Sequence, residues 1–315
     1  MLNRRQLRVK VMQALYAYHQ SDNKAVQAHE KTLLQSIDKV FEMYVWMLAL
    51  MNDVAQYAYV DAEERANRFV KSNREEAGNL KITENLFLKQ VTGHEDYQAA
   101  VKKYRADWSV DPELPRALFA TLKAAPEYAA YLSAEKDHFV PERDISKFIF
   151  KKVILKSTLA DQAFEERFIN WQVDEEVLQA MMAKTFKNFA DSEGSNVKLA
   201  DISANWAEDR EFITELFEAT IRNDKDFQGL ITGKTQNWEA ERIAMMDTLL
   251  MKMALAEFMA FSSIPVKVTI NEYLEIAKEF STPKSNSFIN GILDKILSDL
   301  KAEGKIRKSG RGLVE

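Results

Sequence analysis

The stretch AHEKTLLQSIDKVFEMYVWMLALMNDVAQYAY, residues 28–59, decides the fold class. Its apolar side chains recur at every third or fourth position, from Leu33 and Ile37 through Leu48 to Val54. This spacing places them on one side of an α-helix. The apolar stripe is broad, and a broad stripe predicts a helix that is largely buried.

Helix breakers are scarce outside this stretch as well. The chain has 315 residues but only nine glycines and six prolines, well below the usual share of these residues. A β-sandwich, a barrel or a Rossmann sheet needs more turns. Further helices are expected at 3–20, 144–156, 159–171, 175–189, 209–222, 225–233, 239–261, 270–280 and 285–300. The sequence therefore predicts an all-α fold.

Composition also suggests where the domains end. The polar segment 191–196, with sequence DSEGSN, is the best linker candidate. We expect an N-terminal helical region at 1–196 that includes the first helix, a C-terminal bundle at 197–303 and a mobile basic tail at 304–315. Thr269 and Glu272 have the spacing of a capping box, which predicts a helix start at that point.

The charge is distributed unevenly. The first twenty residues contain Arg4, Arg5, Arg8 and Lys10 and no acid, and residues 304–314 contain four cations and no acid. The whole chain carries −5, so the segment between these ends is strongly acidic. Two basic ends on an acidic body suggest an anionic partner, although basic ends are also common as solvated tails.

The sequence lacks the residues and motifs that most catalytic and metal-binding sites require. Cysteine is absent, the four histidines are dispersed, and no Walker loop, GxGxxG or GxSxG motif occurs. We expect no enzyme, no catalytic residue, no metal and no cofactor. No segment has the length and apolarity of a membrane span, and the start does not resemble a signal peptide. These features favour a cytoplasmic protein without a membrane partner.

Three motifs give the chain a family resemblance. The first is NRRQLRVKVMQALY at 3–16; the second is IPVKVTINE at 264–272, followed by LEIAKEF at 274–280; the third is SNSFINGILD at 285–294. Together they resemble the NusB family of bacterial transcription antitermination factors. The resemblance covers 3–20 and about 206–300, and 21–200 departs from it as an enlargement of the N-terminal helical region.

This resemblance implies a function as well as an all-α fold of two helical bundles, of which the C-terminal one is NusB-like. It implies binding of single-stranded boxA RNA in ribosomal RNA transcripts, together with ribosomal protein NusE, and action on elongating RNA polymerase. The RNA surface that it implies lies on the first helix, at one acidic position and at the start of the last helix. Its residues are Arg4, Arg5, Arg8, Tyr16, Asp247, Lys284, Ser285 and Phe288. We add Lys10, a further cation on the first helix, to this predicted RNA surface. Lys284 stands where the best-known members have an acid, which puts identical RNA specificity in doubt.

The residue types support RNA binding independently, because cations hold phosphates and aromatic faces stack bases. Core roles for Tyr16 and Phe288 are equally compatible with the sequence. Gly291, inside a predicted helix, suggests close approach by another helix or by RNA. The alternative function is a helical protein-interaction scaffold without specific RNA binding. An RNA methyltransferase is disfavoured, because the chain has neither a glycine-rich cofactor motif nor a cysteine nucleophile.

Overall fold

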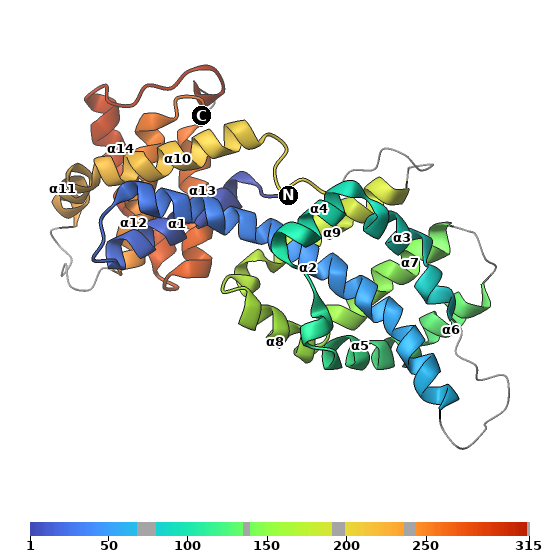
Figure 1. Ribbon diagram of the computed structural model, residues 1–315. Coiled ribbons are helices and arrows are strands. Elements are labelled where there is room, and N and C mark those ends of the chain that lie inside the picture. Colours follow the sequence, from blue (N-terminus) through green and yellow to red (C-terminus); the bar gives the residue numbers. More distant parts are fainter. Residues whose placement is uncertain (68–79, 135–138, 191–198, 236–243, 314–315) are drawn as a thin grey trace. The chain divides into compact units, whose positions relative to one another are not determined.

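The computed structural model describes residues 1–67, 80–134, 139–190, 199–235 and 244–313. Within these ranges the regular structure is helical, without a strand (Figure 1). The predicted all-α class is therefore confirmed. The chain divides into two compact units: Met1 with residues 38–204, and residues 2–37 with residues 205–315. In the part that the structure describes, no helix is both long and apolar enough to span a membrane.

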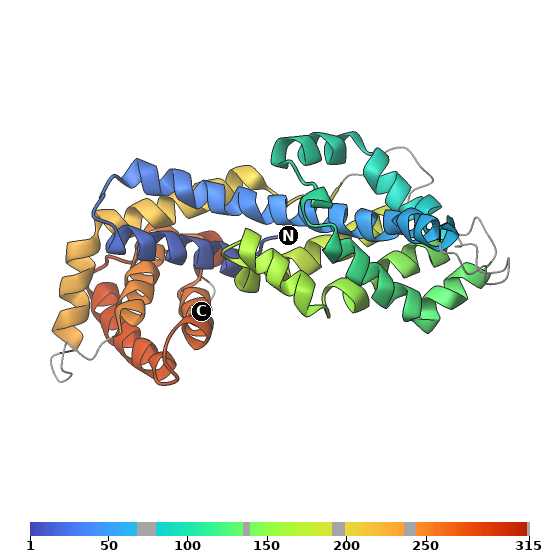
Figure 2. The same cartoon turned by 60° about the horizontal axis from the view of Figure 1, so that its bottom comes forward.

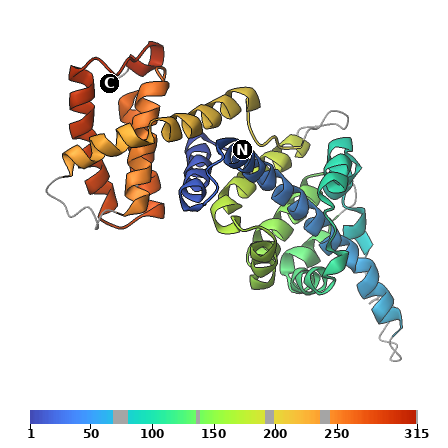
Figure 3. The same ribbon diagram turned by 60° about the vertical axis from the view of Figure 1, so that its left-hand side comes forward.

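The unit of residues 38–204, called the insert unit below, consists of short helices around one long one (Figure 3). The long helix is α2 (Val26–Ala66), whose first residues up to Ile37 count with the other unit. The remaining helices are α3 (Leu86–Gly93), α4 (Glu95–Tyr104), α5 (Glu113–Ala124), α6 (Pro126–Ser133), α7 (Phe139–Phe148), α8 (Thr158–Arg167) and α9 (Trp171–Ala190). Short 3₁₀ turns lie at Leu80–Glu84 and Trp108–Val110, and a π-helical turn lies at Ile149–Ile154.

Aromatic side chains and a buried hydroxyl hold the insert unit together. The Trp46 and Trp108 rings pack edge to face at 5.1 Å, and the Trp108 indole donates to the Trp46 carbonyl. Tyr44 and Thr185 share a buried hydrogen bond of 2.5 Å. Burial raises the pKa of the Tyr44 hydroxyl to about 12, so this group stays protonated as a donor. The broad apolar stripe predicted at 28–59 is therefore the surface through which α2 packs against its neighbours.

The second unit, called the C-terminal bundle below, is built around α12 (Met245–Ala260) (Figure 2). Leu249, Met253 and nearly all their neighbours on α12 are buried, because α12 packs against five other helices of the described chain. Those helices are α1 (Arg4–Gln20), α10 (Trp206–Arg222), α11 (Asp224–Lys234), α13 (Val266–Phe280) and α14 (Ser285–Ala302).

The first helix lies in the C-terminal bundle, whereas the sequence placed it in the N-terminal region. Leu7, Val11, Met12 and Leu15 are at most 1% exposed, and α1 packs against α10, α12 and α13. Apolar side chains lie on most sides of α1. Packing among several helices therefore removes more apolar surface from water than packing on one side would. The predicted linker at 191–196 lies outside the described residues, and the two units divide between 204 and 205.

The predicted capping box at Thr269 is wrong. Helix α13 already begins at Val266, with Pro265 as its N-cap residue. The Thr269 hydroxyl is buried and donates to Glu257 Oε1 at 2.7 Å. Glu272 instead accepts hydrogen bonds from Arg5. Both polar side chains thus serve long-range contacts, which sequence spacing alone does not distinguish from a cap.

The described part of the basic tail contacts the bundle. Lys308 Nζ donates to the Phe261 carbonyl at 2.8 Å, and the Ser309 amide donates to the Ser262 carbonyl at 3.0 Å. Burial lowers the pKa of the Lys308 ammonium. A 3₁₀ turn follows at Gly310–Leu313. These contacts attach the tail to the turn between α12 and α13, where the sequence predicts mobility.

Candidate nucleic-acid interface

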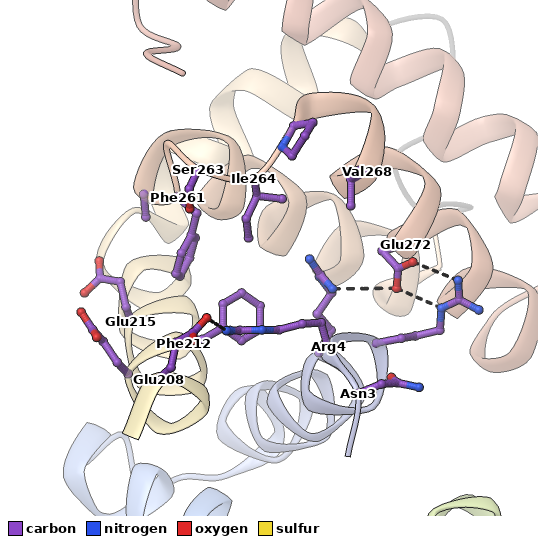
Figure 4. Close-up of a pocket in the computed structure, with 15 residues that line it drawn as sticks. Asn3, Arg4, Glu208, Phe212, Glu215, Phe261, Ser263, Ile264, Val268 and Glu272 are labelled. Atoms are coloured by element: carbon purple, nitrogen blue, oxygen red, sulfur yellow. Dashed lines mark hydrogen bonds and ion pairs between the residues drawn. The ribbon is translucent and has the colours of Figure 1, made fainter. Parts of the chain in front are cut away.

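Two arginines at the start of α1 are partly exposed and ion-paired (Figure 4). Asn3 caps the helix by accepting from the Gln6 amide, while the Gln6 side chain accepts from the Asn3 amide. The Arg4 guanidinium pairs with Glu208 and is 37% exposed. Arg5 binds Glu272 through two hydrogen bonds of 3.0 Å and is 41% exposed. The hydrogen bond that Arg5 donates to Glu272 raises the pKa of the Arg5 guanidinium.

Arg8 is a buried structural residue. Its guanidinium is 2% exposed and donates to both Glu257 oxygens, at 2.8 and 2.6 Å. Glu257 is fully buried and also accepts from the Thr269 and Tyr273 hydroxyls. Burial lowers the pKa of the Arg8 guanidinium, but the hydrogen bonds and charge of Glu257 outweigh burial and raise that pKa overall. We therefore assign Arg8 to holding α1 against α12 and α13.

The part of α1 that belongs to the predicted RNA surface is only partly open. Lys10, like Arg8, is 2% exposed. Tyr16 is 41% exposed, so its ring faces solvent one turn before the end of the helix. Of the five α1 residues in the predicted RNA surface, Arg4, Arg5 and Tyr16 are accessible.

A second group of predicted residues meets where three helices end or begin. Asp247, in the first turn of α12, is 5% exposed, and its carboxylate accepts from the hydroxyls of Ser281 and Ser285. Ser285 is 1% exposed. Lys284 is exposed and Phe288 is half-buried, one turn further along α14. Asp247 therefore fixes the start of α14, while Lys284 and part of Phe288 face solvent.

The end of α1 lies beside this group. The Gln20 amide nitrogen is 3.4 Å from the Met245 sulfur, which places the last turn of α1 next to the first turn of α12. Tyr16, Lys284 and Phe288 thus belong to the same end of the C-terminal bundle. Arg5 lies about 16 Å away from Tyr16 along the axis of α1, from the helical rise per residue.

Two helix N-termini at this end lack a side-chain cap. Neither Ala244 before α12 nor Lys284 before α14 forms a side-chain hydrogen bond to its helix. Free backbone N–H groups and the helix dipole favour an anion at such ends. The sequence suggested the start of α14 but not the start of α12, because the predicted helix extended upstream to 239.

The sequence also missed the role of Glu257. It is an acid within the apolar run from Met253 to Met259, at a position where the side chain must be buried. An acid in such a run requires a partner, and Arg8, between apolar residues of α1, was available as one. That pairing could have been predicted from the two patterns together.

The part of the chain from α9 to α14 matches a known family. Residues 172–298 match the model described as the NusB family. The chain contains a NusB-family domain. This match begins in α9, so it includes part of the insert unit and the second and third motifs but not the motif at 3–16.

Curated NusB proteins are similar to about a third of the chain. The chain is 42% identical over 105 residues to the transcription antitermination protein NusB of Salinibacter ruber, covering 33% of this chain and 66% of that protein. It is 43% identical over 117 residues to that of Chloroherpeton thalassium, covering 37% and 53%. It thus spans between about half and two thirds of these relatives. No solved structure matches it.

Proposed function

We propose that this chain is a transcription antitermination factor that binds single-stranded, boxA-like RNA of ribosomal RNA transcripts. In this proposal it acts with ribosomal protein NusE on elongating RNA polymerase. The relatives that share its NusB domain are named transcription antitermination proteins. The observation that carries RNA binding is the exposed Tyr16 ring at the same bundle end as Lys284 and two uncapped helix N-termini.

These groups suit a single strand because they supply its two main kinds of contact. An exposed aromatic ring stacks an unpaired base, and this stacking tolerates different bases. Backbone N–H groups at a helix start, with an ammonium beside them, bind a phosphate. Tyr16 would take the base, while Lys284 and the first turn of α14 would take the phosphate. The half-buried Phe288 ring offers a second apolar contact.

The other predicted residues enter the proposal in different roles. Arg4 and Arg5 extend the surface along α1, and each must exchange a carboxylate for a phosphate to do so. Asp247 and Ser285 are positioning residues, because their hydrogen bond fixes the helix start that carries Lys284. Arg8 and Lys10 are buried, so they support the fold and do not contact RNA.

Equilibrium binding of a fluorescent 12-nucleotide boxA-like RNA to the full chain tests this function. We expect Tyr16→Ala and Lys284→Glu each to weaken binding about tenfold, since one stacked base or one charged phosphate contact is worth about 1–3 kcal/mol. We further expect NusE to tighten binding of the unmodified chain.

Two substitutions in the insert unit serve as matched controls. Tyr59→Ala removes a ring that is 43% exposed on α2, and Lys102→Glu reverses an exposed charge on α4. Both should leave the affinity unchanged. If the RNA does not bind, or if the controls weaken binding as much as the bundle variants do, the proposed function is wrong.

A further inference from the structure

A groove of about 1110 Å³ opens beside the first turn of α1 (Figure 4). Its walls are α10, the start of α1, the α12–α13 turn and the start of α13. Its apolar lining consists of Phe212, Phe261, Ile264, Pro265 and Val268. Val268 is 44% exposed, and Phe261, Ile264 and Pro265 are half-buried. Apolar side chains gathered in an open concave surface are typical of a site that a partner covers.

The charges on the rim of the groove favour a cationic partner. Glu208, Glu211 and Glu215 follow one another along the groove side of α10. Arg4 already pairs with Glu208, Arg5 pairs with Glu272, and Glu215 pairs with Arg222. Glu211 is exposed and has no ion pair with any described residue. The free charge on this rim is therefore negative.

We propose that this groove binds a protein segment that carries apolar side chains flanked by lysine or arginine. The apolar side chains would insert between α10 and the α12–α13 turn, and a cation would face Glu211. An amphipathic helix docked in an apolar groove makes contacts of this kind. RNA fits less well, because its phosphates would meet the carboxylates of α10. The groove shares Arg4 and Arg5 with the proposed RNA surface, whereas Tyr16 and Lys284 of that surface lie towards the opposite end of α1.

The walls of the groove are fixed before any partner arrives. Glu257 joins Arg8, Thr269 and Tyr273, and so holds three of the surrounding helices together. The tail contacts of Lys308 and Ser309 hold the α12–α13 turn from outside the groove. A preformed groove loses little conformational entropy on binding, which favours affinity for a short segment.

Peptide binding to the full chain tests the inference. The probes are fluorescent 14-residue peptides with leucine at every third or fourth position and lysine or arginine on the flanks. Matched peptides carry glutamate in place of the cations, or serine in place of leucine. We expect the basic-apolar peptides to bind most tightly and to shift the methyl resonances of Ile264 and Val268. Glu211→Lys and Val268→Lys should each weaken binding about tenfold.

The controls repeat these changes away from the groove. Glu176→Lys reverses an exposed acid on α9, and Val110→Lys replaces a side chain that is 74% exposed. Both lie in the insert unit and should not alter binding. Equal binding of the acidic peptides, equal losses in the control variants or unmoved methyl resonances would overturn the inference. A 12-nucleotide RNA that shifts the Ile264 and Val268 methyls would assign the groove to RNA and refute it as well.

Discussion

Arg5 and Arg8 are three positions apart on α1, yet their surroundings give them different roles. Arg5 is 41% exposed and pairs with a carboxylate that solvent also reaches, whereas Arg8 is 2% exposed and pairs with the fully buried Glu257. The sequence predicts a cationic first helix but does not distinguish these two environments. The distinction depends on α12 and α13, which are about 250 residues further along the chain.

Replacement of Arg8 by methionine should destabilise the C-terminal bundle. It leaves the Glu257 carboxylate buried without its counter-ion, and such a loss costs about 3–5 kcal/mol. The free energy of unfolding in urea measures the effect. Arg210→Met, on the exposed side of α10, should change that free energy by less than about 0.5 kcal/mol.

The double variant Arg8→Met with Glu257→Gln separates charge from packing. It removes the uncompensated carboxylate, so we expect it to be more stable than Arg8→Met alone. If Arg8→Met unfolds at the same urea concentration as the unmodified protein, the buried ion pair does not hold α1 in the bundle.

Helix positions were more predictable than helix contacts. The expected segments 3–20, 209–222, 225–233 and 285–300 agree with α1, α10, α11 and α14 to within a few residues. Their apolar periodicity is local and strong, so the sequence alone is enough to place these helices. The start of α13 and the grouping of α1 with the C-terminal bundle depend on distant partners, which periodicity does not contain.

Within α14, the expectation that Gly291 marks a close approach by another helix is wrong for the described residues. A Cβ built at Gly291 meets no atom within 4 Å, and the residue is exposed. Gly291→Ala should therefore stabilise the protein by about 0.5–1 kcal/mol, the difference in helix propensity. Urea unfolding measures this gain.

Gly304 provides the contrasting case at the end of the same helix. Its φ is +65°, a conformation that costs an L-residue energy. Gly304→Ala should therefore lower the free energy of unfolding, whereas Gly291→Ala should raise it. A destabilising Gly291→Ala would show that α14 needs glycine at this site, and a loss of RNA affinity without loss of stability would indicate that RNA approaches there.

At the scale of the whole molecule, the NusB-family domain and the insert unit differ in how far the sequence explains them. The motifs at 3–16, 264–280 and 285–294 lie in the C-terminal bundle, and they indicated its fold and its family. Residues 38–171 lie outside the family match. Periodicity predicted several of their helices, but no motif there indicates a partner.

The central claim is that RNA binds the folded surface of the C-terminal bundle and not only the basic tail. The salt dependence of RNA affinity tests it most directly, measured for the full chain and for residues 1–303. Because Arg8 and Lys10 are buried, Arg4, Arg5 and Lys284 remain as the cations of this surface. Three phosphate contacts give a log–log slope of about −2 for a single strand. We expect the truncated chain to keep most of this slope and most of the affinity. A slope near zero after truncation would mean that the tail holds the RNA, and would contradict the claim.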